Sequence, residues 1–303
     1  MIELNNATKT YRSLFGHSVT AVEEFTLQIA EGEVLGIAGP NGAGKSTLLS
    51  LLLGYLRPTS GRVLIRGLEP RSFVEKNGIG YLSELMTIHP SWKAGEALTR
   101  FATLAAIPAA EIPARVNAVI DELGIAEHRD KKIKALSKGN LQRLGVAQAL
   151  LRDEQVIILD EPTHGLDPVW TQRFRGIVEG LRRPARTIII ASHNLDELQR
   201  LADRVAIIDR GRLQRLVQTG YDQATDAGGT YRISVAAGAQ HVKEMFPDAV
   251  DTGEGEFELT FASIIELNAA IGRLIGGGVL MAGVVPARSV LEQQFREAVG
   301  DKS

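Results

Sequence analysis

The sequence contains no cysteine, no long apolar run and almost no net charge. The absence of cysteine excludes disulfides and thiolate metal sites. A formal charge of -2 on 303 residues argues against a protein that binds nucleic acid in bulk, because such proteins usually present a strongly basic face. We therefore expect no nucleic-acid partner.

The sequence also offers no obvious membrane or export segment. Its longest apolar run, LLSLLLGYLRP, is closed by Arg57 and Pro58 and is too short to cross a bilayer. The first residues, MIELNNATKTYR, are polar, and no secretion signal is expected from them. The chain is thus expected in the cytoplasm, unless a partner holds it at a membrane.

Short aliphatic and β-branched runs alternate along the chain with segments of helical periodicity. The runs predict buried parallel strands near residues 33–39, 155–161, 186–193 and 204–211. Such alternation is typical of an α/β core with a parallel sheet. Between about 85 and 150, two helical patterns follow each other without a strand. We predict an inserted helical subdomain there, within a first domain over residues 1–220.

A linker of small residues, ATDAGGT, precedes a carboxy-terminal region with a pattern of its own. This region predicts the order β-α-β-β-α-β and a final helix, which is the split βαβ or ferredoxin-like pattern. Two capping boxes, Ser263 with Glu266 and Ser289 with Glu292, indicate where two helices begin. We predict a small α+β accessory domain over residues 229–303, and it shows no catalytic constellation.

The stretch GPNGAGKST fits the P-loop pattern G-x-x-x-x-G-K-[ST] between a predicted strand and a predicted helix. Its glycines let backbone N–H groups turn toward phosphate oxygens, and the positive end of the helix faces the same anion. The lysine is expected to reach the β- and γ-phosphates, and the serine to bind Mg²⁺. The predicted nucleotide-binding residues are Gly39, Pro40, Asn41, Gly42, Ala43, Gly44, Lys45, Ser46 and Thr47.

Two further predicted strands end in groups that suit phosphate chemistry. VIILDEP ends in two carboxylates, of which Asp160 is placed to hold Mg²⁺ and Glu161 to orient or deprotonate an attacking water. Alone, this would be an ordinary solvated acidic pair, but the P-loop strengthens the catalytic interpretation. IIIASH ends at His193, on the edge where open α/β sheets bind ligands.

A fourth segment, ALSKGNLQRLGVAQAL, reads as a helix with Ser137 as its N-cap. A simple cap does not require Lys138, Gly139 and Asn140 behind it. Because a helix N-terminus with a lysine attracts negative charge, the residues indicate an anion site at this tip.

Together these motifs resemble the nucleotide-binding subunit of an ABC transporter, over roughly residues 1 to 218. Residues 39–47 match Walker A and 156–161 match Walker B, while SKGN stands where the family's signature usually reads L-S-G-G-Q. HGLDP, with Asp167, resembles the D-loop, and His193 matches the switch histidine. Tyr11 matches the aromatic residue that stacks on adenine, although an ordinary aromatic at a strand edge would look the same.

The resemblance implies a homodimer that sandwiches two ATP molecules with Mg²⁺. The signature of each chain would then face the ATP held by Walker A of the other. It also implies a separately encoded membrane permease, which would hold the chain peripherally at the cytoplasmic face of the membrane. The SKG-type signature and the small carboxy-terminal domain are closest to an exporter branch of the family.

Three positions depart from the family pattern. Lys138 and Asn140 replace a glycine and a glutamine of the usual signature. Glu84, in GYLSEL, replaces a glutamine that contacts the metal, and its carboxylate could still ligate Mg²⁺. His164 stands where serine is common, and the sequence assigns it no role.

Two other classes of protein stay open at this point. A soluble ABC ATPase acting on ribosomes typically carries two cassettes, and one acting on DNA carries a long coiled coil; this chain has one Walker A and no heptad run. A P-loop kinase would lack the signature and the switch histidine.

Overall fold

The computed structural model describes residues 1–12, 18–219, 229–287 and 290–300. The chain divides into two compact units: residues 1–219 with the last residues from 298, and residues 220–297. Within the described residues, no helix has both the length and the apolar character needed to cross a bilayer.

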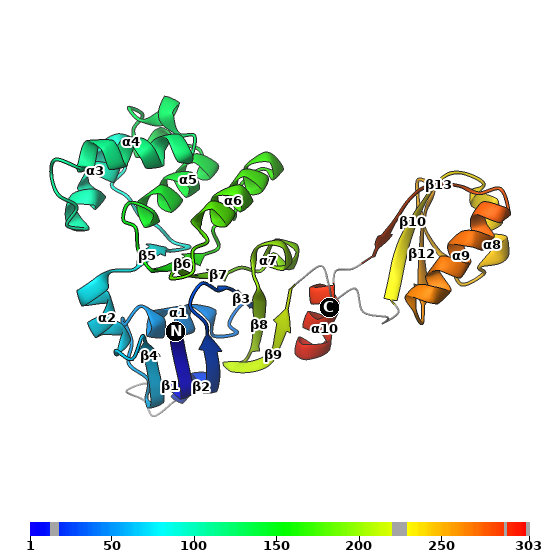
Figure 1. Cartoon of the computed structure of the whole chain (residues 1–303), viewed down its shortest axis with the longest axis horizontal. Helices are drawn as coiled ribbons and strands as arrows, with labels where there is room; N and C mark the ends of the chain where they lie inside the picture. The colour runs from blue at the N-terminus through cyan, green and yellow to red at the C-terminus, as the bar shows by residue number, and fades with distance from the viewer. Residues whose placement is uncertain (13–17, 220–228, 288–289, 301–303) are drawn as a thin grey trace. The chain divides into compact units, whose positions relative to one another are not determined.

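A six-stranded sheet forms the centre of the first unit (Figure 1). In spatial order its strands are β5 (Gly80–Leu82), β6 (Val156–Asp160), β7 (Thr187–Ala191), β3 (Val34–Ala38), β8 (Arg204–Asp209) and β9 (Arg212–Gln218). All neighbours run parallel except β9, which is antiparallel to β8. Every residue of β3, β6 and β7 is buried, which explains their unbroken apolar sequence. The predicted α/β core is confirmed.

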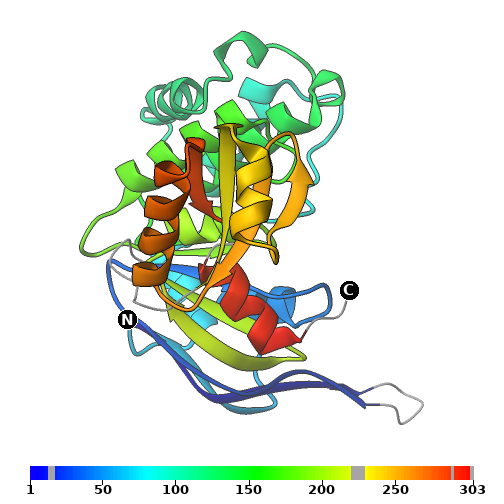
Figure 2. The same cartoon turned by 90° about the vertical axis from the view of Figure 1, so that its right-hand side faces the viewer.

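Helices complete the first unit. They are α1 (Lys45–Leu52), α2 (Pro70–Asn77), α3 (Ala94–Leu104), α4 (Ile112–Glu122), α5 (Lys138–Ala149), α6 (Pro168–Leu181) and α7 (Leu195–Leu201), with short 3-10 turns at Ala126–His128 and Ile133–Ala135. In the sequence, α3, α4 and α5 lie between β5 and β6, and the three helices pack on one another, as the helical periodicity predicts. Figures 1 and 2 show this group on one side of the six-stranded sheet.

An antiparallel sheet, which the sequence reasoning missed, lies on the other side (Figure 2). It contains β1 (Ile2–Arg12), β2 (Ser18–Ile29) and β4 (Ser60–Ile65), in the order β2-β1-β4. Its inward side chains, including Ile2, Leu4 and Phe25, share one apolar core with Leu48 and Leu51 of α1. This packing anchors the helix that follows the P-loop.

The second unit has the predicted order of elements. These are β10 (Gly229–Ala237), α8 (Ala239–Met245), β11 (Val250–Gly253), β12 (Glu256–Phe261), α9 (Ile264–Gly276) and β13 (Leu280–Pro286), and α10 (Val290–Val299) follows. The strands form an antiparallel sheet in the order β11-β12-β10-β13, and both figures show α8 and α9 on one face of it. The ferredoxin-like name stays a prediction.

The predicted capping box of Ser263 and Glu266 is present with one altered hydrogen bond. Ser263 Oγ accepts a hydrogen bond from the backbone N–H of Glu266 at 3.2 Å. The Glu266 carboxylate accepts from the N–H of Ala262, at 2.7 Å, so the return bond reaches one residue further back than the pattern predicts. Ser289, of the second box, lies outside the described residues.

Candidate functional site

The P-loop follows β3 and is shaped by two glycines that the chain itself requires. A Cβ atom at Gly39 would lie 2.5 Å from the carbonyl oxygen of Ile208. At Gly44, the N-cap of α1, φ is +105° and a Cβ would lie 2.4 Å from the carbonyl oxygen of Ala21. Any side chain at either position would collide with backbone. The loop is therefore held in one shape by its neighbours.

The start of α1 is suited to an anion. No side chain caps its first turn, so capping groups do not compete for its N–H groups. Lys45 Nζ donates to the carbonyl oxygens of Gly39, at 2.5 Å, and Pro40, at 3.2 Å. Burial lowers the pKa of Lys45, while the carboxylates of Glu161, Asp160 and Glu84 oppose that shift. The lysine thus lies between the loop and a group of acids.

That group of acids is chemically suited to a divalent cation. Burial raises the pKa of Asp160 to about 6, and the charges of Glu84 and Glu161 act in the same direction against Lys45. Three carboxylates facing one lysine leave an excess of negative charge, and carboxylate and hydroxyl oxygens are the ligands that Mg²⁺ prefers. The residues present therefore fit Mg²⁺, and Ser46, in the first turn of α1, adds a hydroxyl.

Glu161 is held in an unusual backbone conformation directly after β6. Its φ is +49°, in the left-handed region that residues other than glycine rarely adopt. Its N–H donates to the carbonyl oxygen of Ala191 at 2.8 Å, which ties it to the end of β7. Strain of this kind is common where a side chain must be aimed, and here it aims a carboxylate along the edge of the sheet.

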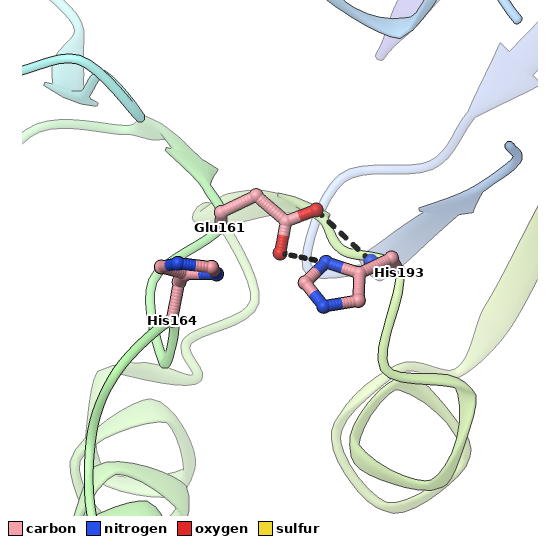
Figure 3. Close-up of side chains that lie close together, drawn as sticks. All are labelled: Glu161, His164 and His193. Carbon is pink, nitrogen blue, oxygen red and sulfur yellow. Dashed lines mark hydrogen bonds and ion pairs between the residues drawn. The ribbon is translucent and has the colours of Figure 1, made fainter. Parts of the chain in front are cut away.

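The carboxylate of Glu161 meets two residues that follow β7 (Figure 3). Oε2 lies 2.8 Å from Nδ1 of His193, and Oε1 accepts from the backbone N–H of His193 at 3.0 Å. Ser192 Oγ also donates to Oε2, at 3.3 Å. The Glu161 side chain is 8% exposed and that of His193 62%, so a buried carboxylate faces an accessible imidazole. The structure brings both predicted catalytic residues together, and adds Ser192.

The signature segment begins α5 as predicted. Ser137 Oγ accepts from the N–H of Asn140 at 3.2 Å, and the Asn140 amide lies 2.7 Å from Nε2 of the buried His128. Lys138 is the first helical residue and has no positive φ, so its replacement of glycine causes no backbone strain. A Cβ at Gly139 would meet nothing in the chain closer than 3.6 Å. Nothing in its own chain requires a glycine there.

Helix α5 is also tied directly to the segment that follows β6, a contact that the sequence reasoning missed. Gln142 Nε2 donates to the carbonyl oxygens of Glu161, at 2.9 Å, and Pro162, at 3.2 Å. The only sequence signal is a glutamine one turn behind the signature. The contact couples the signature tip to the backbone that carries Glu161.

The remaining predicted residues have clear structural positions. Asp167 caps α6, accepting from the N–H of Trp170 at 2.9 Å, and lies 3.7 Å from the Arg143 guanidinium. That guanidinium stacks 3.6 Å from the Trp170 ring centroid. Tyr11 lies at the end of β1 with its ring exposed and with Lys9 Nζ 5.7 Å from the ring centroid. Each position is compatible with the predicted role, and neither contact by itself tests it.

The comparisons with known proteins decide the family. A model described as ABC transporter matches residues 22–164. An uncharacterised ABC transporter ATP-binding protein of Nostoc sp. is 33% identical over 300 residues, which cover 97% of this chain and 88% of that one. The chain belongs to the ABC transporter ATP-binding proteins. This cassette is therefore an ATP-binding, ATP-hydrolysing subunit, as the motifs predict.

Two further comparisons give a named relative and a solved structure. The methionine import ATP-binding protein MetN of Geobacillus kaustophilus is 35% identical over 223 residues, covering 70% of this chain and 64% of that protein. The solved dimeric structure of MJ0796, a bacterial ABC transporter cassette, has a TM-score of 0.67 at 24% identity, covering 73% of this chain and 99% of that one. The likeness confirms the cassette fold of the first unit.

Proposed function

We propose that two copies of this chain bind and hydrolyse two ATP molecules between them and so drive a separate membrane permease. The observation that carries the proposal is the cluster at the carboxyl ends of β5, β6, β7 and β3. There, Lys45, Asp160, Glu84 and Glu161 interact electrostatically, and Glu161 contacts His193. These groups divide into a phosphate cradle, a metal site and a base.

The roles follow from the chemistry of each group. Residues 39–47 would wrap the phosphates with backbone N–H groups, and Lys45 would leave the carbonyls of Gly39 and Pro40 to contact them. Ser46, Asp160 and Glu84 would hold Mg²⁺, which neutralises phosphate charge. Glu161 would orient and deprotonate the attacking water, and His193 would hold the carboxylate and contact the γ-phosphate.

The signature would serve the other copy of the chain. Glycine at position 139 permits close approach, yet within its own chain that position has room for a side chain. A phosphate brought in by a second copy is the neighbour that such a glycine would accommodate, at a helix N-terminus that carries Lys138. The MJ0796 cassette was solved as a dimer, which is consistent with this arrangement.

The permease partner follows from the family and from one exposed residue. Leu85, beside Glu84 in the segment between β5 and α3, is 84% exposed and so presents an apolar side chain to a partner. Met86 packs on Gly145 and Trp92 stacks with Arg100 at 4.5 Å, so these two are partly engaged within the chain. We place the docking surface around Leu85, and the cassette at the cytoplasmic face of the membrane.

The direction of transport is proposed to be export, on the basis of the SKG-type signature and the second unit. Because one relative is named for methionine import, direction needs its own test. The copurified complex, reconstituted in vesicles with the cassette outside, should move its substrate inward, away from the cassette. Movement of substrate out of the vesicle lumen, toward the cassette, would establish import instead.

The catalytic proposal is tested by Glu161→Gln. ATP binding should persist while steady-state hydrolysis falls by about 10²–10⁴-fold, the usual contribution of a positioned base. Glu111→Gln, an exposed glutamate on the surface of the helical region, is the matched control and should keep wild-type turnover. Near-normal hydrolysis in Glu161→Gln would refute the assignment of the base.

The transport proposal is tested by purification of the full chain from membranes. The substitution Leu85→Cys introduces the only cysteine of the chain. A crosslinker attached to this cysteine should capture a hydrophobic membrane subunit. Recovery with ribosomes or nucleic acid and no membrane subunit would favour the soluble ABC ATPase over the transporter.

A further inference from the structure

One group of side chains at the site has the composition of a transition-metal centre. It consists of Glu161, His164 and His193, each of which offers one ligand atom, and these atoms lie within 4.8 Å of one another. Figure 3 shows the carboxylate of Glu161 with His193 on one side and His164 on the other. Within the described part of the chain, it is the one cluster of three potential ligands of this kind.

We propose that Glu161, His164 and His193 bind a divalent transition-metal ion of the Zn²⁺ class and that the bound ion inhibits ATP hydrolysis. The site is separate from the oxygen ligands proposed for Mg²⁺. Two imidazoles and one carboxylate are typical ligands of Zn²⁺, Co²⁺ and Ni²⁺, whereas Mg²⁺ prefers oxygen alone. Because the chain has no cysteine, no thiolate competes for such an ion.

The geometry needs only small side-chain movements to close around an ion. Ligand atoms at about 2.0–2.1 Å from Zn²⁺ in tetrahedral geometry lie roughly 3.3 Å apart, against the 4.8 Å limit observed here. Both imidazoles are exposed and can rotate, while the buried carboxylate is held by Ser192 and by the N–H of His193. Hydrogen bonds that orient a ligand in this way are typical support for a metal site.

The backbone also holds His164 near the carboxylate. Its N–H donates to the carbonyl oxygen of Glu161 at 3.2 Å, and its ring meets that of His193 edge-on with centroids 5.8 Å apart. A solvent molecule would complete the coordination, and the exposed side gives the ion a path of entry.

Inhibition is the consequence of which groups the ion would occupy. The ion would replace the contact between His193 Nδ1 and Glu161 Oε2, with release of any shared proton, and would hold the carboxylate away from water. This step rests on the proposed roles of Glu161 and His193 in hydrolysis. Binding of the ion rests on geometry alone, so the two can fail separately.

Binding is measured first, on the full chain without nucleotide. Co²⁺ should give a visible absorption band that Zn²⁺ abolishes, and calorimetry with Zn²⁺ should give one site per chain. His164→Ser should weaken binding at least tenfold, while the control His241→Ser, an exposed histidine of α8, should not. Equal binding by wild type and His164→Ser, or no binding by wild type, would overturn the site. His164→Asn repeats the test with a bulkier side chain, and a thermal melt shows that each variant is folded.

Inhibition is measured second, with Mg²⁺-ATP and free Zn²⁺ set by a metal buffer. His164→Ser should match wild type without Zn²⁺ and should resist Zn²⁺ concentrations that suppress wild-type turnover severalfold. If Zn²⁺ binds at His164 but turnover is unchanged, the inhibitory role is wrong and the site stands. If neither protein hydrolyses ATP under any condition, the proposed function has failed, and the Co²⁺ spectrum still decides the binding site.

Discussion

The P-loop and the signature at the start of α5 both contain glycine, but the surroundings of these glycines differ. In the P-loop, a Cβ at Gly39 or Gly44 would collide with a carbonyl oxygen of the same chain, at 2.5 and 2.4 Å. In the signature, a Cβ at Gly139 would make only ordinary contacts, at 3.6 Å to the carbonyl oxygen of Gly165 and to the Leu166 side chain. The P-loop glycines are therefore required by contacts within the chain, whereas the signature glycine has room for a side chain.

This difference indicates that the P-loop is complete in a single chain and that the signature is not. The P-loop needs glycine at positions 39 and 44 to adopt its backbone conformation, so its shape is set by the chain itself. The signature would fold equally well with alanine, so a requirement for glycine there has to come from a group outside the chain. The comparison thus supports a phosphate cradle that is built in one subunit and completed by another.

Gly44→Ala should have the largest effect on the fold. It forces a Cβ into φ +105° and against the Ala21 carbonyl oxygen, which should destabilise the first unit by about 2–4 kcal/mol and abolish ATP binding. Chemical denaturation and nucleotide binding are the measurements. Gly42→Ala is the control for φ alone, since a Cβ at Gly42, with φ +79°, meets nothing within 4 Å. Equal stability of Gly44→Ala and wild type would show that the loop is not internally constrained.

Mixing two inactive variants tests where the signature acts. Lys45→Ala and Ser137→Arg should each be inactive. In a mixed dimer both lesions fall in one composite site, which leaves the other intact. An equal mixture should recover up to about a quarter of wild-type turnover, because half of the dimers are mixed and one of their two sites works.

The matched control for that mixture is Lys45→Ala with Glu161→Gln. Both lesions belong to the cradle of their own chain, so each composite site of a mixed dimer is damaged and no activity should return. Recovery in the control as well would mean that the first result does not report a shared site. A signature that acted within its own chain would leave both mixtures inactive.

Gly139→Ala separates folding from function at the signature. Alanine in the first turn of α5 should leave the free energy of unfolding unchanged or raise it by up to about 1 kcal/mol. Turnover should nevertheless fall by about tenfold or more, because the added methyl group displaces the second chain's phosphate from the backbone N–H groups. Gly176→Ala in α6, where a Cβ meets nothing within 4 Å, should stabilise without lowering turnover. Unchanged turnover in Gly139→Ala would refute close approach at this tip.

The sequence predicts the position of the P-loop and the meeting of the strand ends because both depend on local rules. A P-loop carries its own turn and helix start, and the carboxyl ends of parallel strands must share one edge, which brings Glu161 to His193. The strands β1, β2 and β4 were missed for two reasons. β4 pairs with β1 across about 60 residues, and register over such distances is not written in local periodicity. β1 and β2 are neighbours in the sequence, but register shifts interrupt the alternation along their pairing.

Contacts made by loop side chains were equally beyond the sequence. The bonds from Ser192 and Gln142 to Glu161 depend on how two loops and a helix meet, and neither residue stands at a spacing that marks it. The same applies to His164, whose nearness to His193 follows from the turn after β6. Residue type alone gave His164 no role, and only its position suggests one.

Lys138→Gln should have the smallest effect, and it sharpens the comparison because its two consequences have opposite signs. A lysine in the first turn opposes the positive end of α5, so its removal should stabilise the isolated chain by about 0.3–1 kcal/mol. The same charge should attract the triphosphate of a second chain, so its removal should raise the ATP concentration for half-maximal dimerisation by about two- to fivefold at low salt. Light scattering measures this dimerisation in two proteins, the Glu161→Gln variant and the same variant with Lys138→Gln added. The difference should fade near 1 M salt, where screening extends over only about 3 Å. A chain that becomes less stable, with dimerisation unchanged at every salt concentration, would show that Lys138 serves the fold, by packing on Gly165, and not the partner's ATP.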